Sequence, residues 1–430
     1  MRRLNAGLIP LACLLLVAPC ASVSADPVPA GAAGHNVEAI GYSELGGRPG
    51  FKMSIVQSRE RWYLYVGHFW HRGWSIVDVT DPKDPKLVKF VPGPSNTSTG
   101  QIDIGGTTMI TALSRKRVDW GGDDKLPSGE GVLIWDISDP LNPRQTGHYR
   151  TGHDGTHRNY YSGGKYMHLA AGMKGHRGNI YLIVDISDPA NPVEAGRWWV
   201  PGQKEGETPA PPPATSLHGP PEVVGNTVFL SYGGAGMIIV DIADIAKPKL
   251  VGRLAFSPPY LPFIGTHTIQ PIPGKNLAVV NSEAIRENCK EAANHTSVVD
   301  TSDLTRPRLI ATFPTPLPPA DAKYKSFCDK GGRFGPHNQN QLQHNPFVKK
   351  QDHLIYLTYF NAGLRIYDIS APTAPREAGY FMPPDPKDRR GVLPKEALTV
   401  SSEDVLVDSR GNIYVTDKNL GLYVLRYTGK

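Results

Sequence analysis

The segment IYLIVDISDPANPVEAGRW, residues 180–198, contains the pattern that decides the fold of this 430-residue chain. A run of β-branched and other apolar residues ends at Asp185, and a turn rich in aspartate and proline follows. Proline fixes φ and aspartate hydrogen-bonds its own backbone, so this composition is typical of a tight turn. A second strand-like run leaves the turn, and the segment therefore predicts two strands joined by a turn.

The same pattern occurs six times along the chain. Its aspartates are Asp78, Asp136, Asp185, Asp241, Asp300 and Asp368, which lie 58, 49, 56, 59 and 68 residues apart. Two more strand-like runs precede each copy, and a shortened seventh copy, GLYVLRYTGK, ends the chain at residues 421–430. Four strands per repeat, repeated about seven times, predict an all-β fold, a seven-bladed β-propeller.

The predicted blades form one domain, residues 26–430, whose last blade lacks an outer strand. The segment NVEAIGYSELGG, residues 36–47, resembles the strand PREAGYFMPP, residues 375–384, that follows one of the proline turns. We therefore expect residues 36–46 to complete the last blade, which would close the ring and leave no open edge. The expected blades are residues 51–92, 99–151, 155–201, 216–259, 266–318, 336–385 and 398–430 with 36–46.

Residues 1–25 have the composition of a secretory signal peptide. Two arginines begin the segment, an apolar centre covers residues 8–17, and small residues end it. The protein is therefore expected to be periplasmic or secreted, and no later run is long and apolar enough to span a membrane. Beyond the signal the cysteines are Cys289 and Cys328, and an oxidising compartment predicts one disulfide between them.

The distribution of charge argues against a nucleic-acid partner. The formal net charge is +6, but the basic residues are scattered and form no stripe interleaved with aromatic residues. The chain contains no nucleophile elbow, zinc-binding helix motif or phosphate-binding glycine loop in a suitable context. The aspartate-rich turns lack the clustered oxygen ligands that calcium requires. The expected partner is a small-molecule substrate, and a protein partner stays open.

The copies with the core IVDISDP resemble the LVIVD-repeat proteins, a propeller-type family of bacterial exported proteins. The resemblance covers nearly all of the mature chain, and it implies the fold and leaves the activity open. A weaker resemblance is to the selenium-binding protein and methanethiol oxidase family. It rests on the strand end YDIS at 367–370, on PHN at 336–338 and on HNP at 344–346. That second family implies a metal-dependent oxidase.

Histidines recur at one position of neighbouring predicted blades. His157, His218 and His267 each precede by seven residues the turn between the first two strands of their blade. Because the first strand of each propeller blade lines the central channel, we expect these imidazoles to meet near the axis. In the sixth blade His337 has the more similar local setting and is favoured, while His344 lies one residue out of register and is kept beside it.

Four imidazoles at the axis would suit a transition metal. Neutral imidazole binds iron, copper and zinc, and four of them leave positions open for substrate or oxygen. Glu283, at a strand end, and Glu403, at the entrance of the seventh blade, are the candidates to orient a ligand or move a proton. The sequence thus predicts an exported metal-dependent oxidoreductase that uses iron or copper, with zinc as the alternative metal. The alternative functions are a metal-dependent hydrolase and a non-catalytic surface propeller that binds protein or glycan, its histidines merely lining a polar channel.

Overall fold

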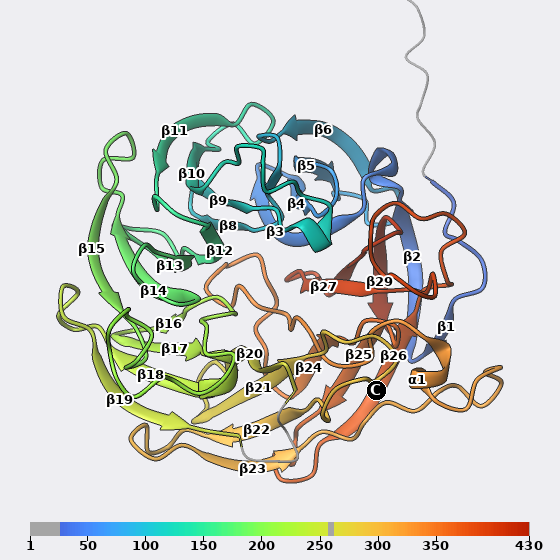
Figure 1. Cartoon of the computed structure of the whole chain (residues 1–430). Coiled ribbons are helices and arrows are strands. Elements are labelled where there is room, and N and C mark those ends of the chain that lie inside the picture. The colour runs from blue at the N-terminus through green and yellow to red at the C-terminus, as the bar shows by residue number, and fades with distance from the viewer. Residues whose placement is uncertain (1–25, 257–261, 430) are drawn as a thin grey trace, which may run out of the picture.

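A computed structural model describes residues 26–256 and 262–429 of the chain, and its regular elements are almost all β-strands. Figure 1 shows the antiparallel sheets set side by side around a central axis. Within the described residues the single α-helix is α1 (Phe327–Lys330), one turn long. The predicted signal segment, residues 1–25, lies outside the described residues. No helix among the residues described is long and apolar enough to cross a membrane.

Following the chain, the first sheet has the strand order β3-β4-β5-β6. Its strands are β3 (Gly50–Ser58), β4 (Arg61–His68), β5 (Gly73–Asp78) and β6 (Lys86–Pro92). A nine-stranded sheet follows, made of β7 (Thr97–Ser98), β8 (Ile102–Gly105), β9 (Thr108–Arg115), β10 (Gly131–Asp136), β11 (Arg144–Tyr149), β12 (Gly155–Tyr160), β13 (Tyr166–Gly172), β14 (Asn179–Asp185) and β15 (Val193–Trp198). Its two halves, β7–β11 and β12–β15, meet through one residue pair, Gly155 with Ser114.

Four-stranded sheets make up the rest of the ring. Two of them consist of β16 (Glu222–Val224), β17 (Thr227–Ser231), β18 (Met237–Asp241) and β19 (Lys249–Leu254), and of β20 (Ile264–Pro271), β21 (Leu277–Glu283), β22 (Thr296–Asp300) and β23 (Arg308–Thr312). The others contain β24 (Leu354–Thr358), β25 (Leu364–Asp368) and β26 (Arg376–Met382) with β1 (Ala33–His35), and β27 (Ser402–Val407), β28 (Asn412–Asp417) and β29 (Leu422–Tyr427) with β2 (Val37–Ser43).

The N-terminal strands join the two ends of the chain. β2 pairs antiparallel with β29, from Val37 opposite Tyr427 to Ser43 opposite Leu422, as the sequence predicts. β1 adds a strand to β26 of the preceding sheet, which the sequence analysis did not predict. Between β1 and β2 the backbone turns at Asn36, whose φ is +53° and whose side-chain amide donates to the Ala378 carbonyl oxygen. The N-terminal segment therefore stabilises two neighbouring sheets.

The repeated aspartates close their own turns. In each of the six copies the aspartate Oδ1 accepts a hydrogen bond from the backbone N–H two residues later, as Asp185 does from Ser187 at 2.9 Å. These carboxylates are occupied by turn contacts, in agreement with their interpretation as turn formers rather than calcium ligands. Apolar residues of facing sheets fill the spaces between them, for example Leu64 and Met53 with Tyr414 and Val424. Each such buried aliphatic side chain contributes roughly 1.5–3 kcal/mol.

Candidate metal site

Irregularities in the inner strands determine which side chains reach the axis. The register of β12 with β13 shifts between Thr156 and Arg158, so His157 lies in the shifted stretch. The register of β20 with β21 shifts between Ile264 and Thr268, and His267 lies within that stretch. A β-bulge places an extra residue on one strand and changes the direction of its side chain. Both histidines therefore reach the site from bulged inner strands.

The other two histidines of the site come from segments that run alongside the next strand. The backbone N–H of His218 donates to the Ser231 carbonyl oxygen at 2.9 Å, ahead of β16. The backbone N–H of His337 donates to the Thr358 carbonyl oxygen at 2.9 Å, ahead of β24. These bonds fix the backbone of His218 to β17 and that of His337 to β24, so all four imidazoles are held by strand pairing.

The four imidazoles form a continuous row. Ring centroids lie 4.3 Å apart for His157 and His218, 5.0 Å for His218 and His267, and 4.8 Å for His267 and His337. The structure thus brings together the residues that share the seven-residue spacing, and adds His337 from the following sheet.

His344 lies elsewhere in the axial region. Its Nε2 is 3.1 Å from Asp103 Oδ1, and its ring packs on that of Tyr160 with centroids 4.7 Å apart. Its contacts within the described part of the chain include none with the four-histidine row. The near-register position of His344 is therefore misleading, because the chain between His337 and β24 is irregular and does not keep the strand periodicity.

Glu283, the last residue of β21, faces this row. Its Oε2 lies 3.1 Å from His218 Nε2 and 3.4 Å from His267 Nε2, and its Oε1 lies 3.7 Å from His337 Nε2. The Nε2 atoms of His157 and His218 are 3.3 Å apart. Two ligand atoms about 2.1 Å from a tetrahedral ion are about 3.4 Å from each other. His218, His267 and Glu283 therefore have the separations of atoms that could share one ion.

Hydrogen bonds select the tautomers of two of the histidines. His337 Nδ1 lies 2.8 Å from the backbone carbonyl oxygen of Glu403, which can only accept, so Nδ1 carries the proton and Nε2 has the free lone pair. His267 Nδ1 lies 2.7 Å from Thr268 Oγ1, and that hydroxyl donates onward to the His337 carbonyl oxygen. Both Nε2 atoms are therefore in the form that binds metals, with the other nitrogen held as in many metal sites.

The Oε2 atom of Glu283 provides the test of fit to a cation. It is buried and accepts no well-directed hydrogen bond from any described residue, although two imidazole nitrogens lie within 3.4 Å. Buried carboxylate oxygens are normally paired, because an unpaired buried charge costs several kcal/mol. Lone pairs of nitrogen and oxygen that face one another are satisfied by a shared cation, so the donor set fits a metal ion.

Electrostatics favours the protonation states that a bound cation would require. Burial lowers the pKa of His157, His267 and His337 well below the usual value, so these rings are neutral. Arg333 Nη1 lies 3.4 Å from Glu283 Oε1 and supports the anionic form. The site therefore combines neutral nitrogen ligands with one carboxylate.

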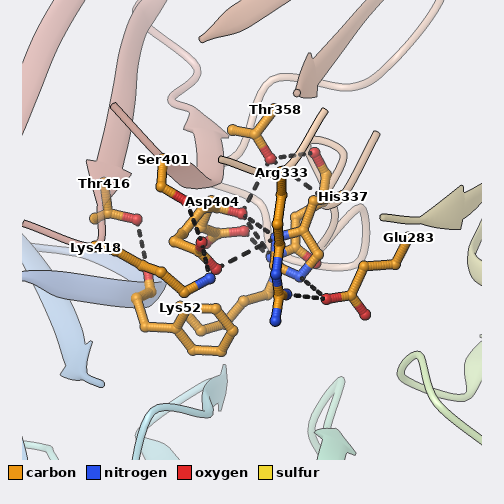
Figure 2. Close-up of polar contacts among 12 residues, drawn as sticks. Lys52, Glu283, Arg333, His337, Thr358, Ser401, Asp404, Thr416 and Lys418 are labelled. Atoms are coloured by element: carbon orange, nitrogen blue, oxygen red, sulfur yellow. Dashed lines mark hydrogen bonds and ion pairs between the residues drawn. The ribbon is translucent and has the colours of Figure 1, made fainter. Parts of the chain in front are cut away.

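Glu403 touches the site but is already paired. It lies in β27 where the register with β28 shifts between Ser402 and Asp404. Its carboxylate forms an ion pair with the buried Lys418 ammonium, which also lies 5.0 Å from the ring centroid of Phe360. Figure 2 shows Lys418 on one side of His337 and Arg333, with Glu283 on the other. Glu403 supports the row through its backbone oxygen, and burial raises the pKa of its carboxyl. Its predicted role in moving a proton stays a prediction.

Three cations near the row were not identified from the sequence. Arg333 contacts Glu283, Lys418 contacts Glu403, and Arg158 Nη2 lies 3.1 Å from His267 Nε2. Arg158 follows His157 directly, and a strictly alternating strand would point it away from the axis. The position of Arg158 at the axis depends on the bulge in β12, and nothing in the sequence indicates that bulge.

The two cysteines form the predicted disulfide. Cys289 lies in the loop between β21 and β22, Cys328 lies in α1, and their Cα atoms are 5.5 Å apart. The loop that contains Cys289 also pairs with the segment ahead of β24, since the backbones of Glu287 and Arg333 form an isolated antiparallel β-bridge. The disulfide thus joins two loops whose pairing positions Arg333 beside Glu283.

Comparisons with known proteins support the fold and not a particular activity. No curated protein matches the chain. Among solved structures, the β-propeller domain of Cps50 (Swd1) from Myceliophteria thermophila aligns with a TM-score of 0.52 and 11% identity over 87% of this chain and 99% of that one. A protein from Lactobacillus plantarum aligns with a TM-score of 0.51 and 11% identity over 88% of this chain and 97% of that one. At such identities the likeness concerns the fold alone.

The sequence pattern of the LVIVD repeat matches four segments. They are residues 62–91, 175–199, 222–255 and 353–382, which contain strands of four of the sheets. The expected resemblance to LVIVD-repeat proteins is thus confirmed, whereas the weaker one to selenium-binding proteins stays a prediction. The chain is an all-β protein with β-propeller relatives in structure, and it carries four LVIVD repeats.

Proposed function

We propose that this protein is a metal-dependent enzyme whose transition metal lies on the axis of a seven-bladed, single-domain propeller. The blades are the four-stranded sheets together with the two halves of the nine-stranded sheet. His218, His267 and Glu283 are the central ligands, and His157 and His337 flank them. The observation that carries the proposal is the set of ligand-atom separations between 3.1 and 3.4 Å around a carboxylate oxygen without a hydrogen bond.

The donor set defines the chemistry. Imidazoles with one carboxylate suit iron, copper(II) or zinc better than metals that prefer thiolates or only oxygen ligands. When bound, such an ion supplies Lewis-acid activation of substrate, oxygen or water at its open positions. We favour an oxidoreductase with iron or copper, and zinc would indicate a hydrolase instead.

Access to the ion differs between the two ends of the histidine row. The side chain of His218 is 21% exposed and His157 is also partly exposed, whereas His267 is 0% exposed and His337 is buried. A small organic substrate would therefore approach from the side of His157 and His218. The residues around His337 would hold the ion and exclude water from its far side.

The disulfide supports the predicted location. Disulfides form and persist in oxidising compartments and are rare in the cytosol. The pairing of Cys289 with Cys328 therefore agrees with export directed by residues 1–25 to the periplasm or the medium. Fractionation of cells that express the full chain tests this part of the proposal, and a protein found only in the cytosol would contradict it.

Elemental analysis tests the metal directly. We expect about one iron or copper per purified, reconstituted chain, with most of it lost in His218→Ala and His267→Ala. His344→Ala is the matched control, because His344 pairs with Asp103 and not with the row, and it should keep its metal. A wild-type protein that stays free of metal after reconstitution would refute the proposal.

Oxygen uptake then separates the two kinds of enzyme. The metal-loaded protein is screened against thiols, phenols and alkenes. Uptake with one of these classes supports the oxidoreductase, and zinc without uptake indicates a hydrolase.

A further inference from the structure

The guanidinium of Arg158 contacts a nitrogen atom that the proposed metal ion would need as a ligand. Its Nη2 lies 3.1 Å from His267 Nε2, the same nitrogen that faces Glu283 Oε2. A guanidinium can only donate hydrogen bonds, so this contact uses the lone pair of His267 Nε2. The lone pair cannot bind an ion and accept this hydrogen bond at once, and two cations this close repel each other. Binding of a metal to His267 therefore requires Arg158 to move.

A small cavity lined by Arg158 gives its guanidinium space for a short displacement. The cavity has a volume of about 10 Å³, room for about one water, and is lined by residues that include Arg158, Gln101, Asn159 and Glu222. Arg158 Nη1 already donates to Gln101 Oε1 at 3.1 Å, and its buried Nε has no partner among the described residues. The side-chain amide of Asn159 also has no hydrogen bond to a described residue. The cavity wall thus contains polar groups that have no hydrogen bond to a described residue.

Glu222 is the acid in this cavity that can receive the guanidinium. It is 4% exposed, and within the described part of the chain its carboxyl makes no hydrogen bond or ion pair. Burial raises the pKa of Glu222 to about 8 although His344 and Lys52 nearby act to lower it, so Glu222 is mostly protonated at neutral pH. Asp103, the other acid of the cavity, is already bound by His344 and by the backbone N–H of Tyr161. A guanidinium beside Glu222 would stabilise its ionised form.

We propose that Arg158 is a displaceable cap on the metal site: it covers His267 Nε2 in the metal-free protein and moves to Glu222 when the ion binds. This inference rests on the proposed function. As Arg158 moves, the Glu222 carboxyl releases one proton to solvent. The divalent ion adds two positive charges to the buried region and the released proton removes one, so the net charge rises by one. The cap satisfies the lone pair of His267 Nε2 in the absence of metal and lowers the affinity for every ion that enters the site.

A second arginine gives the contrast that makes the proposal testable. Arg333 Nη1 lies 3.4 Å from Glu283 Oε1 and leaves Oε2 directed at His218 and His267. Arg333 thus positions a ligand, whereas Arg158 competes with the metal for one. Both are buried arginines of the same site, and their removal should change metal affinity in opposite directions.

The experiment is a zinc titration of metal-free protein against a chromophoric chelator at constant pH. Arg158→Met should bind Zn²⁺ at least about tenfold more tightly than wild type, because a hydrogen bond to a charged group corresponds to about a factor of ten or more in an equilibrium constant. Arg333→Met, the matched control, should bind more weakly. Glu222→Gln should weaken Zn²⁺ binding in the wild type, because the displaced guanidinium then has no carboxylate to pair with. In the Arg158→Met background it should have no effect, because no guanidinium is displaced.

The outcomes separate this inference from the proposed function. If wild type binds Zn²⁺ and Arg158→Met binds it equally or more weakly, the cap is refuted and the metal site stands. If neither protein binds Zn²⁺, both proposals fail, and binding by Arg158→Met alone supports the cap. Should the variant fail to fold, crystal structures of wild type with and without Zn²⁺ decide, and Arg158 still bonded to His267 Nε2 in the zinc form would refute the cap.

Discussion

Two arcs of the ring use the same backbone irregularity for opposite chemistry. We call the sheets that begin with β12, β16, β20 and the segment before β24 the imidazole arc, and the sheets of β27, β3 and β8 the ion-pair arc. Inner-strand shifts present His157 and His267 in the first arc and Glu403 in the second. The shift in β3, between Gly50 and Met53, contains Lys52. The repeated fold therefore provides the position, and the residue at each bulge decides what the position does.

The arcs differ in the surroundings of their buried carboxylates. In the ion-pair arc Lys52 pairs with Asp404 at 2.8 Å, and Asp103 pairs with His344 from the segment before β24. Lys418 pairs with Glu403, whose Oε2 accepts no hydrogen bond from a described residue. In the imidazole arc Glu283 Oε2 faces nitrogen lone pairs and accepts no well-directed hydrogen bond from the described residues. Paired buried charges hold a structure. Glu283 pairs with Arg333 through Oε1 only, and its Oε2, which faces imidazole nitrogens, is placed to share a cation with them. The ion-pair arc is thus expected to carry stability and the imidazole arc to carry metal binding.

The largest expected effect tests the ion-pair arc. Asp404→Ala leaves Lys52 buried without its partner and removes the acceptor of the Met53 N–H, so the free energy of unfolding should fall by about 3–5 kcal/mol. The measurement is urea or guanidinium unfolding of the metal-free protein. Arg144→Ala is the matched control on an exposed pair with Asp136, and it should cost less than about 1 kcal/mol. Equal losses in the two variants would contradict the division into arcs.

The next effect tests the imidazole arc by metal removal. A ligand that binds only the folded state stabilises it by about 2.7 kcal/mol at a hundred times its Kd. Zn²⁺ at that excess should therefore raise the unfolding free energy of wild type and Asp404→Ala by similar amounts, provided that the variant folds. His267→Ala should lose this stabilisation, and a chelator should reverse it in wild type. Stabilisation that persists in His267→Ala would place the ion elsewhere.

The sequence predicts one arc better than the other, for a physical reason. The histidines share a fixed distance to a turn within their own blade, so local spacing is sufficient to align His157, His218 and His267. The ion pairs join residues far apart in the chain, such as Lys52 with Asp404, and no local pattern connects them. The strand β1 escaped prediction for the same reason, because it pairs with β26 at the other end of the sequence.

Bulges limit prediction within the site itself. Strand alternation places His157 and Arg158 on opposite faces, but the register shift at this point lets both reach the axis. The irregular stretch after His337 likewise removes His344 from the row and leads it to Asp103. The repeat therefore predicts which blades contribute histidines to the site. The backbone irregularities decide which cationic and acidic side chains lie beside those histidines.

The smallest expected effect connects the disulfide to metal affinity. The disulfide between Cys289 and Cys328 joins two loops that also pair through a backbone β-bridge between Glu287 and Arg333. From the second of these loops the Arg333 side chain contacts Glu283. The double variant Cys289→Ser, Cys328→Ser should fold with a few-fold weaker affinity for Zn²⁺, because Arg333 is then held less firmly beside the carboxylate. In the Arg333→Met background the same serines should change the affinity no further, since the residue they position is gone. A further loss in that background would mean that the loops touch the ion by a route other than Arg333.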